Sequence, residues 1–87
     1  MFVNKELFYR QIGTKIAYFR KIVGYSQEEL AEKIDVHRTV IARIESGTYN
    51  DNVSLGIILD IAEALKIEPY CLLQFSELEK ELWNRNF

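Results

Sequence analysis

The sequence predicts an all-α fold, and three observations lead to this prediction. Apolar residues recur at spacings of three and four over most of the chain, which is typical of one face of an amphipathic helix. Ser26 and Ser76 each precede a glutamate in the S-x-x-E pattern of a capped helix N-terminus. No segment carries a competing strand signal. We therefore expect short helices joined by tight turns.

The first helix is predicted by an inward-facing stripe that ends at a glycine. The stripe consists of Phe8, Ile12, Ile16, Phe19 and Val23. Gly13 lies inside this helix and costs about 1 kcal/mol relative to alanine, whereas Gly24 is suited to end it. The capping box of Ser26 and Glu29 then begins the second helix.

The window from Gln27 to Ser46 predicts two short helices with a sharp turn at Asp35. Such a turn often needs a positive φ angle, which aspartate tolerates at a cost of about 1 kcal/mol. The spacing points four residues inward: Ala31, Ile34, Ile41 and Ile44. It leaves five others facing outward: His37, Arg38, Thr39, Val40 and Arg43. A short helix with a basic, hydrogen-bonding face that packs on a second helix is shaped to enter a DNA groove.

Further helices are expected after residue 53. Ser54 is a suitable N-cap for the fourth helix. Its inward residues are expected to be Leu55, Ile58, Ile61 or Ala62, and Leu65. Pro69 suits the first turn of a fifth helix. Ser76 and Glu79 predict either a short sixth helix or a kinked extension of the fifth.

Length and composition indicate one domain over residues 1–87, with its core at about residues 8–75. Apolar residues make up 48% of the chain and charged residues 28%, which is typical of a globular protein. The first residues do not resemble a signal peptide, and no apolar run is long enough to span a bilayer. We therefore expect a cytoplasmic protein that does not contact a membrane.

Chemistry-bearing residues are few. The chain has one cysteine, Cys71, and one histidine, His37, so neither an internal disulfide nor a zinc ligand set is expected. Cys71 lies in an apolar stretch and is interpreted as a buried, inert thiol. No catalytic triad, glycine-rich phosphate loop or isolated carboxylate pair indicates an enzyme. The sequence therefore predicts no catalytic activity, no metal or other cofactor and no small-molecule ligand.

The net charge is the main objection to a nucleic-acid partner, because its formal value is −2. Residues 1–53 hold eight basic and seven acidic residues, whereas residues 54–87 hold three basic and six acidic residues. The excess acid is therefore distant in sequence from the window, and the local potential matters more than the total. A protein-interaction module that keeps the fold without binding DNA is the alternative function.

Two stretches of the chain resemble one known family. They are IGTKIAYFRKIVGYSQEELAEKIDVHRTVIARIESG and VSLGIILDIAEALKIEPYCLL, and the family is the lambda-repressor/Cro (XRE-type) helix-turn-helix family. The resemblance implies a compact five-helix bundle, here with a short C-terminal helical extension. It also implies that the second and third helices bind double-stranded DNA. Members of the family are mostly repressors or activators that bind palindromic operators as dimers.

Carried over by position, the resemblance implies that Arg38, Thr39 and Arg43 read base edges. The planar guanidinium of arginine matches guanine N7 and O6, so the two arginines are the best candidates for guanine contacts. Val40 offers only apolar contact, and packing on the second helix is its equal alternative. The resemblance further implies an ion pair between Arg20 and Glu45 that joins the first and third helices.

A second set of residues is expected to contact DNA phosphates, which position a protein without reading sequence. The resemblance places Gln27 and His37 in this set. Tyr49 and Asn50 add hydrogen-bond donors, and Arg20 and Lys15 add positive charge near the backbone. Two positions depart from the family pattern: the corner residue, usually glycine, is Asp35, and the third-helix cap, usually serine or threonine, is His37.

The C-terminal extension, residues 76–87, is predicted to take part in a symmetric dimer seam. Large apolar residues are more numerous there than a small domain can readily bury by itself. The expected interface residues are Leu72, Phe75, Leu78, Leu82 and Trp83, with part of the fourth and fifth helices. The alternative is that this tail folds back over its own bundle.

Together these observations predict a sequence-specific DNA-binding regulator of transcription. It would act as a homodimer on a palindromic operator. The size of the chain resembles that of phage-type repressors, restriction–modification controller proteins and antitoxins, and the sequence does not choose among these three contexts.

Overall fold

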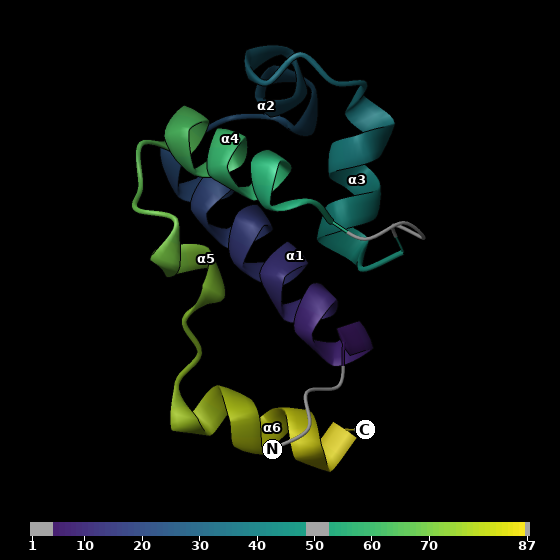
Figure 1. Cartoon of the computed structure of the whole chain (residues 1–87), viewed down its shortest axis with the longest axis vertical. Coiled ribbons are helices and arrows are strands. Elements are labelled where there is room, and N and C mark those ends of the chain that lie inside the picture. The colour runs from purple at the N-terminus through teal and green to yellow at the C-terminus, as the bar shows by residue number, and fades with distance from the viewer. Residues whose placement is uncertain (1–4, 49–52, 87) are drawn as a thin grey trace.

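The computed structural model describes residues 5–48 and 53–86 of the chain. These residues form six helices, which confirms the all-α prediction. In chain order they are α1 (Lys5–Val23), α2 (Gln27–Lys33), α3 (Arg38–Ser46), α4 (Leu55–Leu65), α5 (Tyr70–Leu73) and α6 (Glu77–Asn86). Helices α1 to α5 form a bundle, and α6 lies at the opposite end of the long axis from α2 (Figure 1). The expected five-helix bundle with a C-terminal extension is therefore the observed architecture.

Helix α1 runs through the middle of the bundle and supplies part of the core. Ile12 and Ile16 are buried, and Phe8 and Phe19 are half-buried against them. Val23 is exposed instead, because it occupies the last turn of the helix. Most of the predicted stripe is therefore correct.

The packing of α1 on α3 explains the glycine at position 13, which helix propensity alone does not. A Cβ atom at this position would lie 2.1 Å from the carbonyl oxygen of Ile44 and 2.9 Å from that of Glu45. Both oxygens belong to the backbone of α3 and cannot move away as a side chain could. The glycine therefore allows α1 and α3 to approach each other more closely than any other residue would permit.

The caps that bound α2 and α3 follow from local sequence. Ser26 Oγ accepts a hydrogen bond from the Glu29 amide at 3.0 Å, and Glu29 Oε1 accepts one from the Ser26 amide at 2.9 Å. These bonds with Ser26 lower the pKa of the Glu29 carboxyl. Asp35 has a φ angle of +58°, as predicted for the corner. His37 acts as the N-cap of α3, because its Nδ1 accepts a hydrogen bond from the Thr39 amide at 3.1 Å.

The core lies where α1, α2, α3, α4 and α5 meet. Its buried members are Ile12, Ile16, Leu30, Ala31, Ile41, Ile44, Ile58, Ile61, Ala62, Leu65 and Leu72. The prediction that Leu55 points inward is wrong, since this side chain is 66% exposed. Leu55 is the first residue of α4 and lies at the edge of the stripe formed by Ile58, Ala62 and Leu65.

Leu72 also lies in the core, and the prediction that it contributes to a dimer seam is wrong. Its side chain is 0% exposed, because the short helix α5 packs it against α1 and the rest of the bundle. Phe75 is half-buried and meets Phe8 edge to face, with ring centroids 5.2 Å apart. This part of the tail therefore folds back on its own chain.

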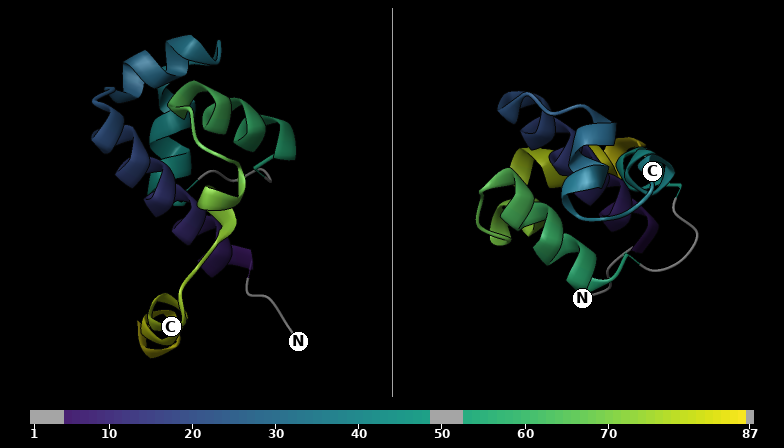
Figure 2. Two further views of the ribbon diagram at one scale, coloured as in Figure 1. Left: turned by 90° about the vertical axis from the view of Figure 1, so that its left-hand side faces the viewer. Right: turned by 90° about the horizontal axis from the view of Figure 1, so that it is seen from above.

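Helix α6 is a separate helix and not an extension of α5. Ser76 Oγ accepts a hydrogen bond from the Glu79 amide at 3.1 Å, and Glu79 Oε1 accepts one from the Ser76 amide at 2.9 Å, so the predicted capping box is present. Lys15 of α1 forms an ion pair with Glu79 at 2.9 Å. The bond to the Ser76 backbone and the nearby Lys15 ammonium lower the pKa of the Glu79 carboxyl. Figure 2 shows α6 set apart from α2 and α3.

Candidate DNA-binding surface

The outer face of α3 carries the side chains predicted to read bases. Arg38, Thr39 and Arg43 are exposed, while Ile41 and Ile44 on the opposite side of the helix are buried. Helix α2 packs on α3 from behind, and α6 lies away from both (Figure 1). The reading face is therefore open in the folded chain, which is what the helix-turn-helix prediction requires.

Val40 differs from its neighbours because it is half-buried and packs against the core. The structure therefore favours the packing alternative for this residue over a base contact. Only the part of its side chain that stays exposed is available to a thymine methyl group.

Arg20 forms the predicted ion pair and is not available for DNA. Its Nε lies 2.6 Å from Glu45 Oε2, its Nη2 donates to Glu45 Oε1 at 3.0 Å, and its Nη1 donates to the Tyr25 carbonyl at 2.7 Å. Arg20 is 8% exposed. The structural role is thus confirmed. The expectation that Arg20 contacts phosphate is wrong, because its guanidinium is buried and directed inward to Glu45 and the Tyr25 carbonyl.

Gln27 is half-buried at the start of α2 and connects two helices. Its Nε2 donates to Glu45 Oε1 at 3.0 Å, and its Oε1 accepts a hydrogen bond from Arg38 Nη1 at 3.5 Å. An amide group carries two N–H donors, so one remains for a phosphate oxygen. No local sequence pattern predicts these contacts, since Gln27 and Glu45 lie on different helices.

His37 and Thr39 form a small cluster at the N-terminus of α3. The Thr39 amide donates to His37 Nδ1, and the Thr39 Oγ1 also lies 2.9 Å from this nitrogen. Because Nδ1 accepts, the proton of the neutral ring resides on Nε2, which is left to donate. Both residues are exposed. The capping role leaves the phosphate prediction for His37 and the base-reading prediction for Thr39 chemically possible.

The other three residues predicted to contact phosphate are Lys15, Tyr49 and Asn50. Lys15 faces α6, where it forms an ion pair with Glu79. Gly13 lies on the side of α1 that meets α3, and a residue two positions further along a helix points to the opposite side. The expectation that Lys15 contacts phosphate beside α3 is therefore wrong. Tyr49 and Asn50 lie outside the described residues.

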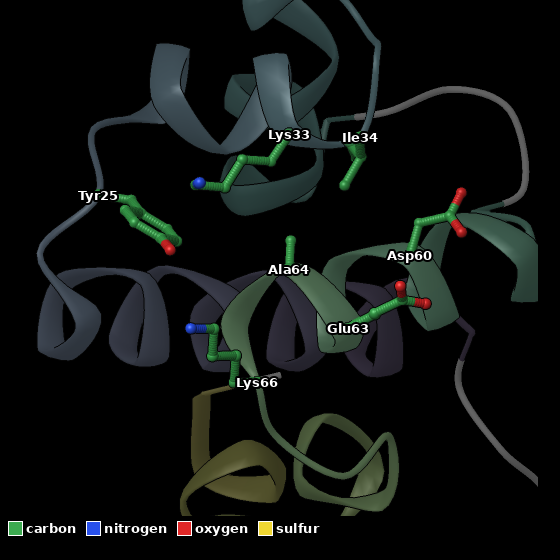
Figure 3. A pocket seen from close by; sticks show the side chains of 7 residues that line it. All are labelled: Tyr25, Lys33, Ile34, Asp60, Glu63, Ala64 and Lys66. Carbon is green, nitrogen blue, oxygen red and sulfur yellow. The ribbon is translucent and has the colours of Figure 1, made fainter.

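A shallow cleft of about 330 Å³ opens between α2 and α4 (Figure 3). Lys33 and Lys66 lie on one side of Ala64, and Asp60 and Glu63 lie on the other. The Lys33 ammonium lies 4.8 Å from the centre of the Tyr25 ring, a cation–π contact that joins α2 to the preceding turn. Because its charges are mixed, the cleft does not extend the basic surface of α3.

Residues 16–70 match the family model described as "Helix-turn-helix". The chain belongs to the helix-turn-helix family. Its lambda-repressor-like fold agrees with this assignment. As a member of the family, the protein is a DNA-binding regulator of transcription and not an enzyme. None of the helices in the described ranges combines the length and the hydrophobicity needed to cross a bilayer.

Two curated relatives illustrate the range of the similarity. Control protein C.BamHI of Bacillus amyloliquefaciens is 49% identical over 53 residues, which is 61% of this chain and 63% of the relative. The match thus spans less than two thirds of the length of that relative. An uncharacterized HTH-type transcriptional regulator of Archaeoglobus fulgidus is 33% identical over 72 residues, which is 83% of this chain and 97% of the relative.

Solved structures support the same assignment. The restriction-modification controller protein C.AhdI from Aeromonas hydrophila is 34% identical, with a TM-score of 0.74, over 80% of this chain and 99% of that one. A hypothetical transcription factor from Neisseria, NHTF, is 28% identical, also with a TM-score of 0.74, over 91% of this chain and 86% of that one. The helix-turn-helix fold is therefore shared along almost the whole length of C.AhdI.

Proposed function

We propose that this protein is a sequence-specific regulator that binds a palindromic operator as a homodimer and controls the genes of a restriction–modification system. The observation that carries the proposal is the open face of α3, where Arg38, Thr39 and Arg43 are exposed above a buried opposite side. The similarity to C.AhdI, a restriction-modification controller protein, favours this context over a phage repressor or an antitoxin.

Base reading follows from the chemistry of the exposed side chains. Each arginine can present two parallel N–H groups to guanine N7 and O6. No other base offers this pair of acceptors in the major groove. Thr39 can lay its methyl group on a thymine methyl or use its hydroxyl as a donor or acceptor. The Nε2–H of His37 and the free N–H of Gln27 supply phosphate contacts at the start of each helix.

The dimer proposal rests on apolar side chains that the single chain leaves exposed. Leu78 of α6 is 63% exposed, and further exposed apolar residues are Leu55, Leu59, Tyr70, Leu73 and Leu82. Two copies joined through such a surface would bury it and would relate two reading helices by a two-fold axis. Such a dimer would place its α3 helices about one DNA turn apart, roughly 34 Å. The side chain of Trp83 lies outside the described residues, so its predicted part in the seam stays a prediction.

Replacing Arg43 with alanine should weaken specific binding without affecting folding. We expect a loss of about 1–3 kcal/mol at the base pair that Arg43 reads, with relaxed selectivity at that position. Selection of bound fragments from random duplex DNA would define the operator, and fluorescence anisotropy would measure the loss. Lys80→Ala removes the same charge from α6 and is the matched control, expected to bind as the unaltered protein does. If the unaltered protein gave no saturable binding at low ionic strength, the protein-interaction alternative would replace this proposal.

Replacing Leu78 with glutamate should convert a dimer to a monomer. Sedimentation equilibrium at micromolar concentration is expected to give twice the chain mass of 10.2 kDa for the unaltered protein and a single chain mass for the variant. Ile22→Glu on α1 is the matched control, because Ile22 is also 63% exposed. A monomeric unaltered protein would contradict the dimer. Dissociation of Leu59→Glu but not of Leu78→Glu would move the seam from α6 to α4.

A further inference from the structure

We propose that Glu45 and Gln27 position the Arg38 guanidinium for base reading, so that the buried ion pair joining α1 to α3 also influences sequence selectivity. The inference rests on the proposed function, since it concerns how one reading side chain is oriented. It is carried by a continuous series of contacts from the interior to the reading face. The series runs from Arg20 to Glu45, from Glu45 to Gln27, and from Gln27 to Arg38.

Glu45 fixes the near end of this series. Its carboxylate accepts hydrogen bonds from Arg20 Nε and Nη2 and from Gln27 Nε2, at 2.6, 3.0 and 3.0 Å. The side chains of Glu45 and Arg20 are 6% and 10% exposed, so neither is free to exchange these partners for water. A buried carboxylate with several donors is held firmly, because moving it would leave charged groups unpaired.

Gln27 transmits this constraint because its amide can adopt only one satisfactory orientation. A carboxylate can only accept hydrogen bonds, so the Gln27 Nε2 must face Glu45. The Oε1 then faces Arg38, whose guanidinium can only donate. A flipped amide would place oxygen against the Glu45 carboxylate and N–H groups against Arg38. Both contacts would become repulsive, so the chemistry at each end selects the same orientation.

The contact to Arg38 is compatible with reading a base. Nη1 uses one of its two hydrogens on Gln27 at 3.5 Å, and Nε–H and both Nη2 hydrogens remain. Guanine needs only two parallel donors. A long exposed arginine otherwise loses its rotamer freedom when it binds, which weakens the interaction. Orienting it beforehand lowers that loss and directs the guanidinium to one base.

The test compares discrimination among base pairs with overall affinity. Arg38→Ala first identifies the base pair that Arg38 reads, as the position where selectivity disappears. Gln27→Met has a similar length and no polar group, and we expect it to lower discrimination at that base pair by about tenfold. The loss of the Gln27 phosphate contact should in addition weaken binding to all duplexes by one common factor, which does not change discrimination. Combining Gln27→Met with Arg38→Ala should cause no further loss of selectivity. Gln74→Met, in the segment before α6, is the matched control.

Each alternative outcome has a distinct meaning. If Gln27 acted only on phosphate, Gln27→Met would weaken binding to all duplexes by the same factor and would leave discrimination at the Arg38 base pair unchanged. That result would overturn the inference while leaving the proposed function intact. If the unaltered protein bound no duplex, both would fail. Thermal unfolding verifies that each variant folds, and Gln27→Ala, a residue with high helix propensity, provides a second variant with the same expected loss of selectivity.

Discussion

Replacing Gly13 with alanine is expected to destabilise the protein by about 2 kcal/mol or more. The added methyl group would collide with the backbone carbonyls of Ile44 and Glu45, and no change of rotamer can relieve a clash with backbone. Alanine normally stabilises a helix by about 1 kcal/mol relative to glycine, so the clash must exceed that gain before any loss appears. Urea denaturation followed by circular dichroism measures the change in the free energy of unfolding.

Gly56 provides the matched control within the same chain. It lies in α4, where a Cβ atom would meet, among the described residues, only Ser54 Oγ at 3.8 Å. Gly56→Ala should therefore stabilise the protein by up to about 1 kcal/mol. If Gly13→Ala were as stable as the unaltered protein, the close packing of α1 on α3 would be contradicted.

Replacing Glu45 with alanine is expected to cost about 3–5 kcal/mol of stability. The change leaves the Arg20 guanidinium buried with the Tyr25 carbonyl as its remaining partner among the contacts described above. An unpaired buried charge is far more costly than the absence of both charges. The same denaturation experiment measures this loss.

The double variant Arg20→Met with Glu45→Leu separates the cost of an unpaired charge from the cost of lost packing. We expect it to recover much of the stability that Glu45→Ala loses, because both buried charges are then absent. A Glu45→Ala variant that loses less than about 1 kcal/mol would indicate a solvent-screened pair instead. That result would also weaken the positioning role proposed for Glu45.

Sequence patterns predicted the helices well because their boundaries depend on neighbouring residues. The capping boxes at Ser26 and Ser76, the positive φ angle of Asp35 and the N-cap at Ser54 are each settled within a few residues. Such signals are readable without knowledge of the tertiary structure.

Contacts between distant segments could not be predicted in the same way. Leu72 and Leu78 are both leucines near the C-terminus, but only packing against α1 distinguishes the buried one from the exposed one. Lys15 has no local sign that Glu79 will hold it. The close approach that requires Gly13 likewise depends on how α3 crosses α1, so a helix-propensity scale counts the residue only as a weakness.

The central claim, that the outer face of α3 binds DNA, is tested most directly by amide chemical-shift mapping. The protein labelled with ¹⁵N would be titrated at low ionic strength with the duplex obtained by selection. We predict saturable shifts concentrated at residues 37–43, together with shifts of the Arg38 and Arg43 Nε signals. The absence of saturable shifts, or shifts confined to α4 and α6, would contradict the account.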